Sequence, residues 1–515
     1  MRRKSFAAYA SLLVLVGASG LVATACGGES AGAKPVATSP AKPPAPPATG
    51  PAAEADPLGP RPEVEPPPLF TPPTPVVFRT AHGINVWLLE RHALPLVAID
   101  VTIPVGSASD PGGEGGLAWA TANMLDEGAG SRGALEFARA VDQLGASLVP
   151  TAGADHSGVS LFVLKRNLTP AFGLLADMVI RPRFDAVEWK RVHDLWMNDL
   201  RTRTREPRAV AAIAASSALY GSDQPYGHPV SGTTTSAGKI DLARVKRFYQ
   251  ASWRPESVTV VAVGDISRAE LSTLLDQSFA DWKPAPGAKA APPSAPVEPK
   301  GTRPRLIVVD RADAPQSQLY VIRPGPAVAD PDATLLERAN IALGGSFSSR
   351  LNLDLREEHG WTYGAGSRVL PMRRAGSVVL SSAVHTENTG DAVKALLKDA
   401  ELYATKGLTA GEVDLTRMTS RAELVQSYEH LSGAASLLAA DAALGLSPTY
   451  EAEAAARRDA ATKADLDRVA LRYFHPKDAV IVIVGPRAKV LPQLEGAGLP
   501  KPEFFDTEGN PRAAR

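Results

Sequence analysis

The feature that most constrains the fold is an internal repeat that spans most of the chain. Three landmarks in the first unit have counterparts in the second: Pro111 and Pro331, Pro255 and Pro476, and Gly264 and Gly485. The offsets within these pairs are 220, 221 and 221 residues. Three landmarks at one spacing indicate a tandem duplication of a unit of about 200 residues.

Each unit mixes strand and helix patterns. In the first unit, branched residues predict strands at 84–89, 96–103, 158–164 and 258–263, and apolar periodicity predicts helices at 116–128, 133–145, 169–180, 186–203 and 268–279. These elements do not strictly alternate, which favours antiparallel over parallel sheets. We therefore predict an α+β fold of two homologous α/β-sandwich halves, each a mostly antiparallel sheet with helices packed on one face.

The N-terminal segment has the pattern of a bacterial targeting signal. Basic residues Arg2-Arg3-Lys4 precede an apolar run, and small residues then lead to Cys26, the only cysteine. This pattern resembles a lipobox, in which the cysteine is lipidated and becomes the mature N-terminus. A plain secretory signal that happens to end near a cysteine is the alternative.

The rest of the chain divides by composition. We predict a signal peptide with a lipobox at 1–25, a Pro/Ala-rich tether at 26–75, a first domain at 76–285, a linker at 286–303, a second domain at 304–495 and a tail at 496–515. The chain has 55 Lys and Arg residues and 55 Asp and Glu residues, so its net charge gives no indication that it binds nucleic acid. Lipidation of Cys26 would place the protein in the bacterial cell envelope as a lipoprotein. Because Gly27 after the cysteine is no retention signal, we expect the outer membrane by default, with the protein facing the periplasm.

One helix carries a motif with its reactive residues replaced. The run from Gly116 to Leu125 resembles the Gly-Leu-Ala-His-x-x-Glu-His-Met-Leu helix of the insulinase/pitrilysin family, in which both His bind zinc and the Glu is the base. Here the two His positions hold Trp119 and Asn123, and the Glu position holds Ala122. Taken alone, the run also fits an ordinary apolar helix.

Further motifs support the resemblance over about residues 76–495. The loop 225–233 is similar to the family's Pro-Tyr-Gly-x-Pro-x-x-Gly-Thr loop. In the second unit, Gly344-Gly345 followed by Ser349-Arg350-Leu351 is similar to its Gly-rich segment. The resemblance implies two homologous halves that close around a cavity as a clamshell.

The resemblance also implies where a third zinc ligand would lie, about 75 residues beyond the second His position. That register falls on Asp199, so only one of the four zinc-site positions carries a metal-binding group. No two of the nine histidines stand three or four residues apart, so no helical His pair replaces the lost one. We predict no metal and no cofactor in this chain, with zinc expected only in a partner.

The second unit keeps a different part of the family's site. Arg356 to Tyr363 is similar to the motif Arg-Glu-x-x-Gly-x-x-Tyr, whose Arg and Tyr hold substrate backbone and stabilise charge on the attacked carbonyl. By resemblance, Arg356 and Tyr363 are substrate-binding residues that assist catalysis at another half. The alternative is structural: Arg350 and Arg356 brace helices, and Tyr363 begins a strand.

Three functions fit this pattern. The first is a non-catalytic subunit that pairs with a zinc-bearing homologue as a heterodimer and helps to enclose extended peptides, as the non-catalytic subunit of mitochondrial processing peptidase does. The second is a peptide-binding or structural scaffold without a peptidase role. The third is a complete peptidase with a rearranged site.

Overall fold

The computed structural model describes residues 69–284, 287, 289–291, 297–299 and 304–513. The predicted signal peptide, Cys26 and most of the predicted tether lie outside the described residues. Thr71–Arg515 forms one compact unit, which contains both halves of the repeat. Among the described residues, no helix has the length and apolar character that crossing a membrane requires.

The first half is built on a six-stranded sheet. Its strand order is β1 (Val76–Arg79), β2 (Asn85–Glu90), β8 (Thr259–Gly264), β3 (Leu96–Ile103), β7 (Ser157–Leu164) and β6 (Ser147–Ala152). Only β2 and β8 pair in parallel, and every other neighbouring pair is antiparallel.

The second half has a seven-stranded sheet with the same core. Its order is β11 (Thr362–Pro371), β12 (Gly376–His385), β10 (Gln316–Gly325), β13 (Val480–Gly485), β9 (Arg305–Asp310), β14 (Pro502–Phe505) and β15 (Pro511–Arg512). The run β11-β12-β10-β13-β9 matches β6-β7-β3-β8-β2 of the first half, including the parallel pair at its end. The predicted pair of mostly antiparallel α/β halves is confirmed.

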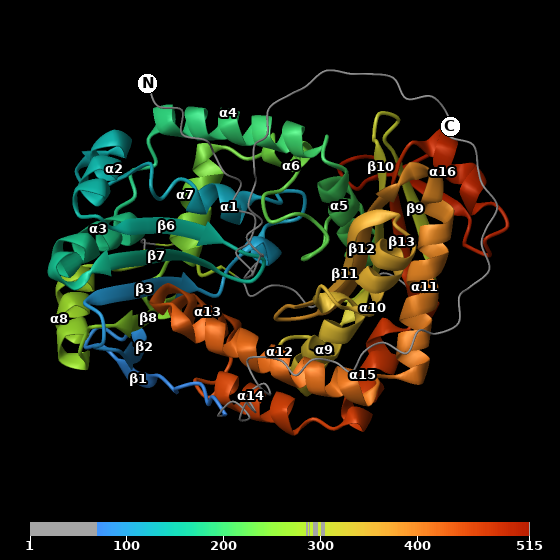
Figure 1. Cartoon of the computed structure of the whole chain (residues 1–515). Coiled ribbons are helices and arrows are strands. Elements are labelled where there is room, and N and C mark those ends of the chain that lie inside the picture. Colours follow the sequence, from blue (N-terminus) through green and yellow to red (C-terminus); the bar gives the residue numbers. More distant parts are fainter. Residues whose placement is uncertain (1–68, 285–286, 288, 292–296, 300–303, 514–515) are drawn as a thin grey trace, which may run out of the picture. The chain divides into compact units, whose positions relative to one another are not determined.

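Helices flank both sheets (Figure 1). In the first half they are α1 (Leu117–Ala122), α2 (Ala134–Gln143), α3 (Leu168–Ile180), α4 (Ala186–Arg203), α5 (Pro207–Tyr220), α6 (Thr234–Ala237), α7 (Leu242–Ser252) and α8 (Arg268–Phe279). In the second half they are α9 (Pro331–Asn340), α10 (Arg350–Asn352), α11 (Thr389–Lys406), α12 (Ala410–Glu429), α13 (Leu431–Leu444), α14 (Tyr450–Ala460), α15 (Lys463–Phe474) and α16 (Arg487–Leu494).

The two halves exchange one helix each. Along β10, Leu319 and Val321 face a core formed with the second half's own helices, whereas Tyr320 and Ile322 face α5 of the first half. In the same way, α13 of the second half packs on β3 and β8 of the first sheet. Each half's own helices thus pack on one face of its sheet, as predicted, and a helix from the other half covers the opposite face.

The C-terminal segment is part of the second half, which corrects the predicted tail at 496–515. Strand β14 pairs in parallel with β9, and Phe505 is buried in the core that contains α5. Gly509 is also tied to the first half, because its carbonyl accepts a hydrogen bond from the Ser217 hydroxyl at 2.7 Å. The sequence did not predict this strand, because a strand of four residues buries few side chains and leaves no long apolar run.

Candidate functional site

Helix α1, which carries the altered motif, begins at a glycine that no other residue replaces without strain. Gly116 has φ 102°, and its N–H and that of Ala118 donate to the Asp110 carboxylate at 2.7 and 2.9 Å. A Cβ at Gly116 would lie 2.7 Å from the Trp196 ring. The glycine therefore allows α1 to pack closely against α4.

An indole pair fills the space between α1 and α4. The rings of Trp119 and Trp196 lie 5.2 Å apart between centroids, with an interplanar angle of 32°. Trp196 is 1% exposed, and its indole N–H donates to the Ser231 carbonyl at 2.9 Å. Trp196 is thus the residue of α4 that Trp119 contacts, and nothing in the sequence motif indicated it.

Ala122 and Asn123, the other two altered positions of the motif, also take part in the packing and hydrogen bonding of α1. Ala122 is buried, and the Asn123 side-chain amide donates to the Trp119 carbonyl at 2.9 Å. Asn123 is the C-cap of α1, which ends at Ala122, whereas the sequence predicted a helix that continues to Gly128. Asp199 lies three residues beyond Trp196 on α4, with an exposed side chain.

These residues do not fit the zinc site of the family motif. Structural and catalytic zinc is held by imidazole, thiolate or carboxylate groups. The positions on α1 instead supply an indole, a methyl group and an amide that already donates to the backbone. His193, on the same face of α4 as Trp196, meets that indole edge-on at 5.9 Å and takes part in aromatic packing.

One group of described side chains has a spacing that suits a metal ion. Ligand atoms of Asp354, Glu358 and His359 all lie within 4.8 Å of one another. Glu358 and His359 are exposed, and the His359 ring stacks on Trp361 at 4.0 Å. Exposed acidic groups commonly cluster without a metal, so the spacing alone assigns no ion.

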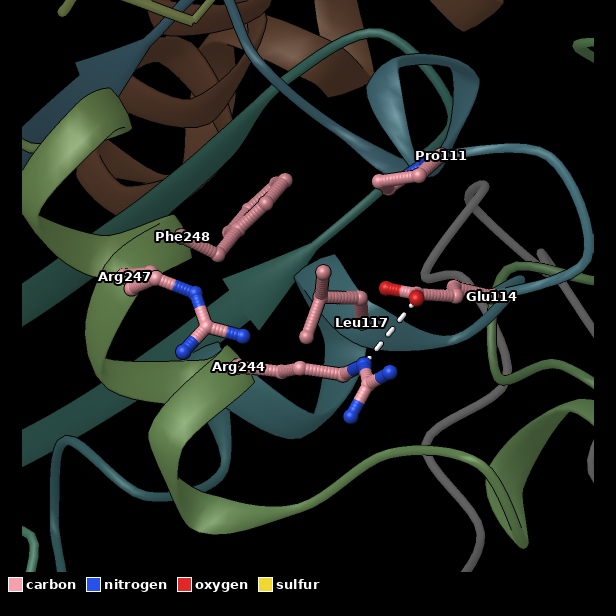
Figure 2. A pocket seen from close by; sticks show the side chains of 6 residues that line it. All are labelled: Pro111, Glu114, Leu117, Arg244, Arg247 and Phe248. Atoms are coloured by element: carbon pink, nitrogen blue, oxygen red, sulfur yellow. Dashed lines mark hydrogen bonds and ion pairs between the residues drawn. The ribbon is translucent and has the colours of Figure 1, made fainter.

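A separate pocket of about 320 Å³ lies beside α1 (Figure 2). Its lining residues are Pro111, Glu114, Leu117, Arg244, Arg247 and Phe248. Arg244 donates to Glu114 at 3.0 Å across the pocket. Leu117 and Trp119 are two residues apart, about 200° around the helix, so this pocket and the indole pair lie on different faces of α1.

The glycines of the second half place a loop against the sheet. Gly344 and Gly345 end the π-helical segment η4 (Ile341–Gly345). A Cβ at Gly344 would lie 2.3 Å from the Ser367 backbone nitrogen in β11, and one at Gly345 would lie 3.0 Å from the Asn340 carbonyl oxygen. Both glycines therefore have a packing role, and Gly344 lets η4 lie close to the middle of β11.

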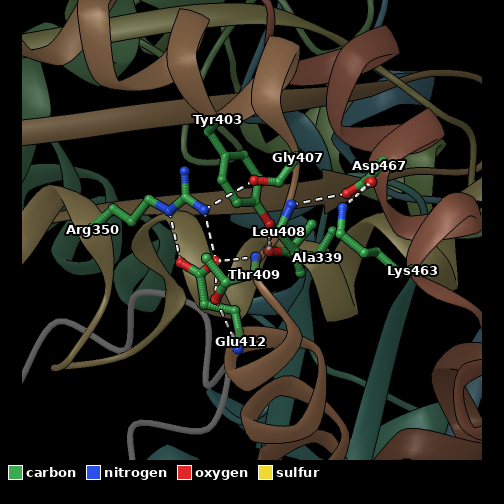
Figure 3. A network of polar contacts seen from close by, with 9 residues as sticks. All are labelled: Ala339, Arg350, Tyr403, Gly407, Leu408, Thr409, Glu412, Lys463 and Asp467. Atoms are coloured by element: carbon green, nitrogen blue, oxygen red, sulfur yellow. Dashed lines mark hydrogen bonds and ion pairs between the residues drawn. The ribbon is translucent and has the colours of Figure 1, made fainter.

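Arg350 has the bracing role that the sequence left open (Figure 3). Its guanidinium donates two hydrogen bonds to Glu412, both at 2.6 Å, and a third to the Gly407 carbonyl at 2.9 Å. The same group lies 4.8 Å from the Tyr403 ring centroid. Arg350 thus joins the end of α11 to the start of α12.

Arg356 and Tyr363 are accessible by contrast. Arg356 lies on the π-helical segment η5 (Leu353–Glu358), pairs with Glu357 at 3.4 Å, and places its guanidinium 4.5 Å from the Phe347 ring centroid. Tyr363 is the second residue of β11, and its side chain is 86% exposed. In the described part of the chain, no hydrogen bond, ion pair or ring contact joins either residue to α1.

Comparison with known proteins supports the predicted resemblance. The family model described as insulinase (peptidase family M16) matches residues 86–233, and the model described as peptidase M16 inactive domain matches residues 239–420. A protein of Mycobacterium bovis named as an uncharacterized zinc protease is 27% identical over 362 residues, 69% of this chain and 81% of its own length.

Two further similarities are to a solved structure and to a second protein sequence. The crystal structure of a peptidase M16 inactive domain from Pseudomonas fluorescens matches with a TM-score of 0.73 at 25% identity, over 80% of this chain and 98% of that one. Cytochrome b-c1 complex subunit 1 of Bos taurus is 21% identical over 257 residues, 50% of this chain and 52% of that protein. With both family models matched in order along one duplicated fold, the chain belongs to the insulinase family of peptidases, peptidase family M16.

Proposed function

We propose that this protein is a non-catalytic subunit that assists a zinc-bearing homologue in cleaving extended peptides. The observation that carries the proposal is a contrast between the two halves. In the first half, Trp119 stands at a position where the family motif has a zinc-binding His, and its indole packs on Trp196. In the second half, Arg356 and Tyr363 stand accessible on the surface.

The chemistry of the accessible pair suits a peptidase site. A guanidinium and a phenol both donate hydrogen bonds to a carbonyl oxygen on which negative charge develops. This role needs a nucleophile and a metal, which the residues of α1 do not supply. We therefore infer that the reacting carbonyl lies in a site completed by a second chain. The similarity to a protein named as a subunit of a larger complex favours such an arrangement.

The proposal includes a place for the complex. A lipid on Cys26 would anchor the chain in the cell envelope, by default in the outer membrane facing the periplasm, and the Pro/Ala-rich segment would separate the anchor from the folded halves. Zinc would be bound only by the partner. The substrate class is an extended peptide, because the pair is suited to backbone carbonyl groups rather than to one side chain.

The test is reconstitution of peptidase activity from two purified chains. The full-length protein is mixed with a homologue from the same cell that carries His-x-x-Glu-His, and hydrolysis of an unfolded peptide is measured. We expect activity only in the mixture. Arg356→Ala combined with Tyr363→Phe should lower kcat by roughly 100-fold or more, as the loss of oxyanion donors does in other enzymes.

Matched controls define the outcome. Arg368→Ala removes an exposed arginine from the same strand as Tyr363 and should leave the rate unchanged. Normal partner activity with the double variant would contradict the proposal, as would chelator-sensitive hydrolysis by this chain alone. Tight peptide binding by the isolated chain, without any effect on the homologue, would favour the scaffold alternative.

A further inference from the structure

Phe347 is an aromatic residue that the fold leaves in solvent. Its side chain is 71% exposed, although it lies two residues beyond Gly345, in a turn whose two glycines are packed against Ser367 and Asn340. Single exposed apolar side chains are common on protein surfaces, so the role of this ring follows from what it contacts.

The neighbour of the exposed ring is Arg356. The Arg356 guanidinium carbon lies 4.5 Å from the Phe347 ring centroid, within the range of a cation–π contact. Arg356 also forms an ion pair at 3.4 Å with Glu357, its neighbour in sequence, whose side chain is 53% exposed. Phe347, by contrast, reaches Arg356 from a different segment of the chain.

We infer that Phe347 is a positioning residue that holds the Arg356 guanidinium in the orientation from which it donates to the reacting carbonyl; this inference rests on the proposed function. An arginine side chain has many rotamers, and an exposed ion pair selects among them weakly. A ring beneath the guanidinium plane leaves the N–H groups at its edge free to donate. The close packing of Gly344 and Gly345 restricts the backbone that leads to Phe347.

The first experiment detects the contact without a partner. In the full-length protein, the Arg356 Nε–H resonance is assigned by its loss in Arg356→Lys, and its chemical shift reports the ring current of a nearby aromatic face. We expect the resonance to move in Phe347→Leu and to stay close to the wild-type position in Phe347→Tyr. An unchanged resonance in Phe347→Leu would overturn the inference.

The second experiment uses the reconstituted peptidase. Phe347→Leu should lower kcat roughly two- to fivefold with little change in KM, the size expected for an exposed cation–π contact, and Phe347→Tyr should restore the rate. In an Arg356→Ala background, Phe347→Leu should cause no further loss, because the ring acts through the guanidinium. Val187→Ala, which alters an 80% exposed apolar residue of the first half, is the control for surface changes.

The outcomes separate the inference from the proposed function. An equal loss from Phe347→Leu with and without Arg356 would mean that the ring contacts substrate or partner directly, and would overturn the positioning role. A full rate in Arg356→Ala itself would contradict the proposed function instead.

Discussion

The Asp155 carboxylate of the first half accepts a hydrogen bond from the backbone N–H of Arg373 in the second half, at 2.9 Å. The other carboxylate oxygen accepts the Tyr226 hydroxyl at 2.6 Å, and the Arg373 guanidinium donates to the Pro104 and Asp155 carbonyls, both at 3.0 Å. Asp155 is 5% exposed. The turn between β11 and β12 is thereby fastened to the first sheet.

This contact predicts that Asp155 contributes to cohesion between the halves. Asp155→Ala leaves the Tyr226 hydroxyl and the Arg373 N–H without their acceptor in a buried place, so we expect a loss of about 2–3 kcal/mol in the free energy of unfolding by urea. Asp223→Ala, which alters an exposed aspartate of the same half, is the control. Equal stability of the two variants would show that the contact is replaceable by water.

The packing of Trp196 on Trp119 predicts that two tryptophan substitutions on α4 reduce the free energy of unfolding by different amounts. Trp196→Ala removes a side chain that is 1% exposed, and we expect about 3–5 kcal/mol of destabilisation from the cavity it leaves. Trp189→Ala, which alters a half-buried tryptophan two turns earlier, should cost clearly less. Chemical unfolding followed by far-UV circular dichroism measures both, and similar losses would contradict the packing described for Trp196.

A buried carboxylate predicts a pH dependence. Burial of Asp100 beneath α13 raises its pKa to about 6, although the hydroxyls of Ser160 and Ser436 donate to it. The folded state therefore binds this proton more strongly than the unfolded chain, so stability is full below about pH 4 and falls as pH rises through about 6.

Replacing that carboxylate should remove the dependence. Relative to wild type, Asp100→Asn should gain on the order of 3 kcal/mol in unfolding free energy between about pH 4 and pH 7.5. Asp142→Asn, which alters an exposed aspartate, should show no such trend. Parallel pH profiles for wild type and Asp100→Asn would mean that Asp100 does not titrate in this range.

The network around Arg350 predicts that lysine is a poor replacement. Arg350→Lys keeps the charge but loses the paired hydrogen bonds to Glu412, so we expect about 1–3 kcal/mol of destabilisation. Arg368→Lys, on an exposed site, should be neutral within about 0.5 kcal/mol. Thermal unfolding measures both variants, and a neutral Arg350→Lys would assign the bracing to packing on Tyr403 alone.

The side chains on α1 predict that removing metal ions does not change the stability of the isolated chain. Because Trp119, Ala122 and Asn123 offer no zinc-binding groups, a chelator should change neither the melting temperature nor the far-UV spectrum of the isolated chain. Elemental analysis of the purified protein should find well below one zinc per chain. Stoichiometric zinc, or a lowered melting temperature with chelator, would favour the rearranged peptidase instead.

Much of the fold follows from local pattern. The strand predicted at 96–103 and the helix predicted at 186–203 match β3 and α4 in full. Long runs of this kind are decided by periodicity and branching within the run itself. The repeat offset likewise anticipated two sheets of matching strand order, because homologous sequences bury homologous faces.

The candidate site was predictable only as a set of positions. The motif located Trp119, Ala122 and Asn123 through a linear register on one short helix. The partner of Trp119 lies 77 residues further along the chain, and linear spacing pointed to Asp199, whose side chain is exposed. Which turn of α4 contacts α1 depends on the angle at which the two helices cross, and this angle cannot be derived from sequence spacing.

The sequence by itself determined that this chain is a duplicated α+β protein of the insulinase family, with no zinc-binding group at three of the four zinc-site positions in one half and with Arg356 and Tyr363 at the matching positions of the other. Only the tertiary structure decided that α5 and α13 cross between the halves, that Trp196 packs on Trp119, and that Phe347 lies beneath Arg356. The reason is physical. Local pattern shows which face of an element is apolar, but the surface that covers it is chosen by contacts between residues far apart in the chain.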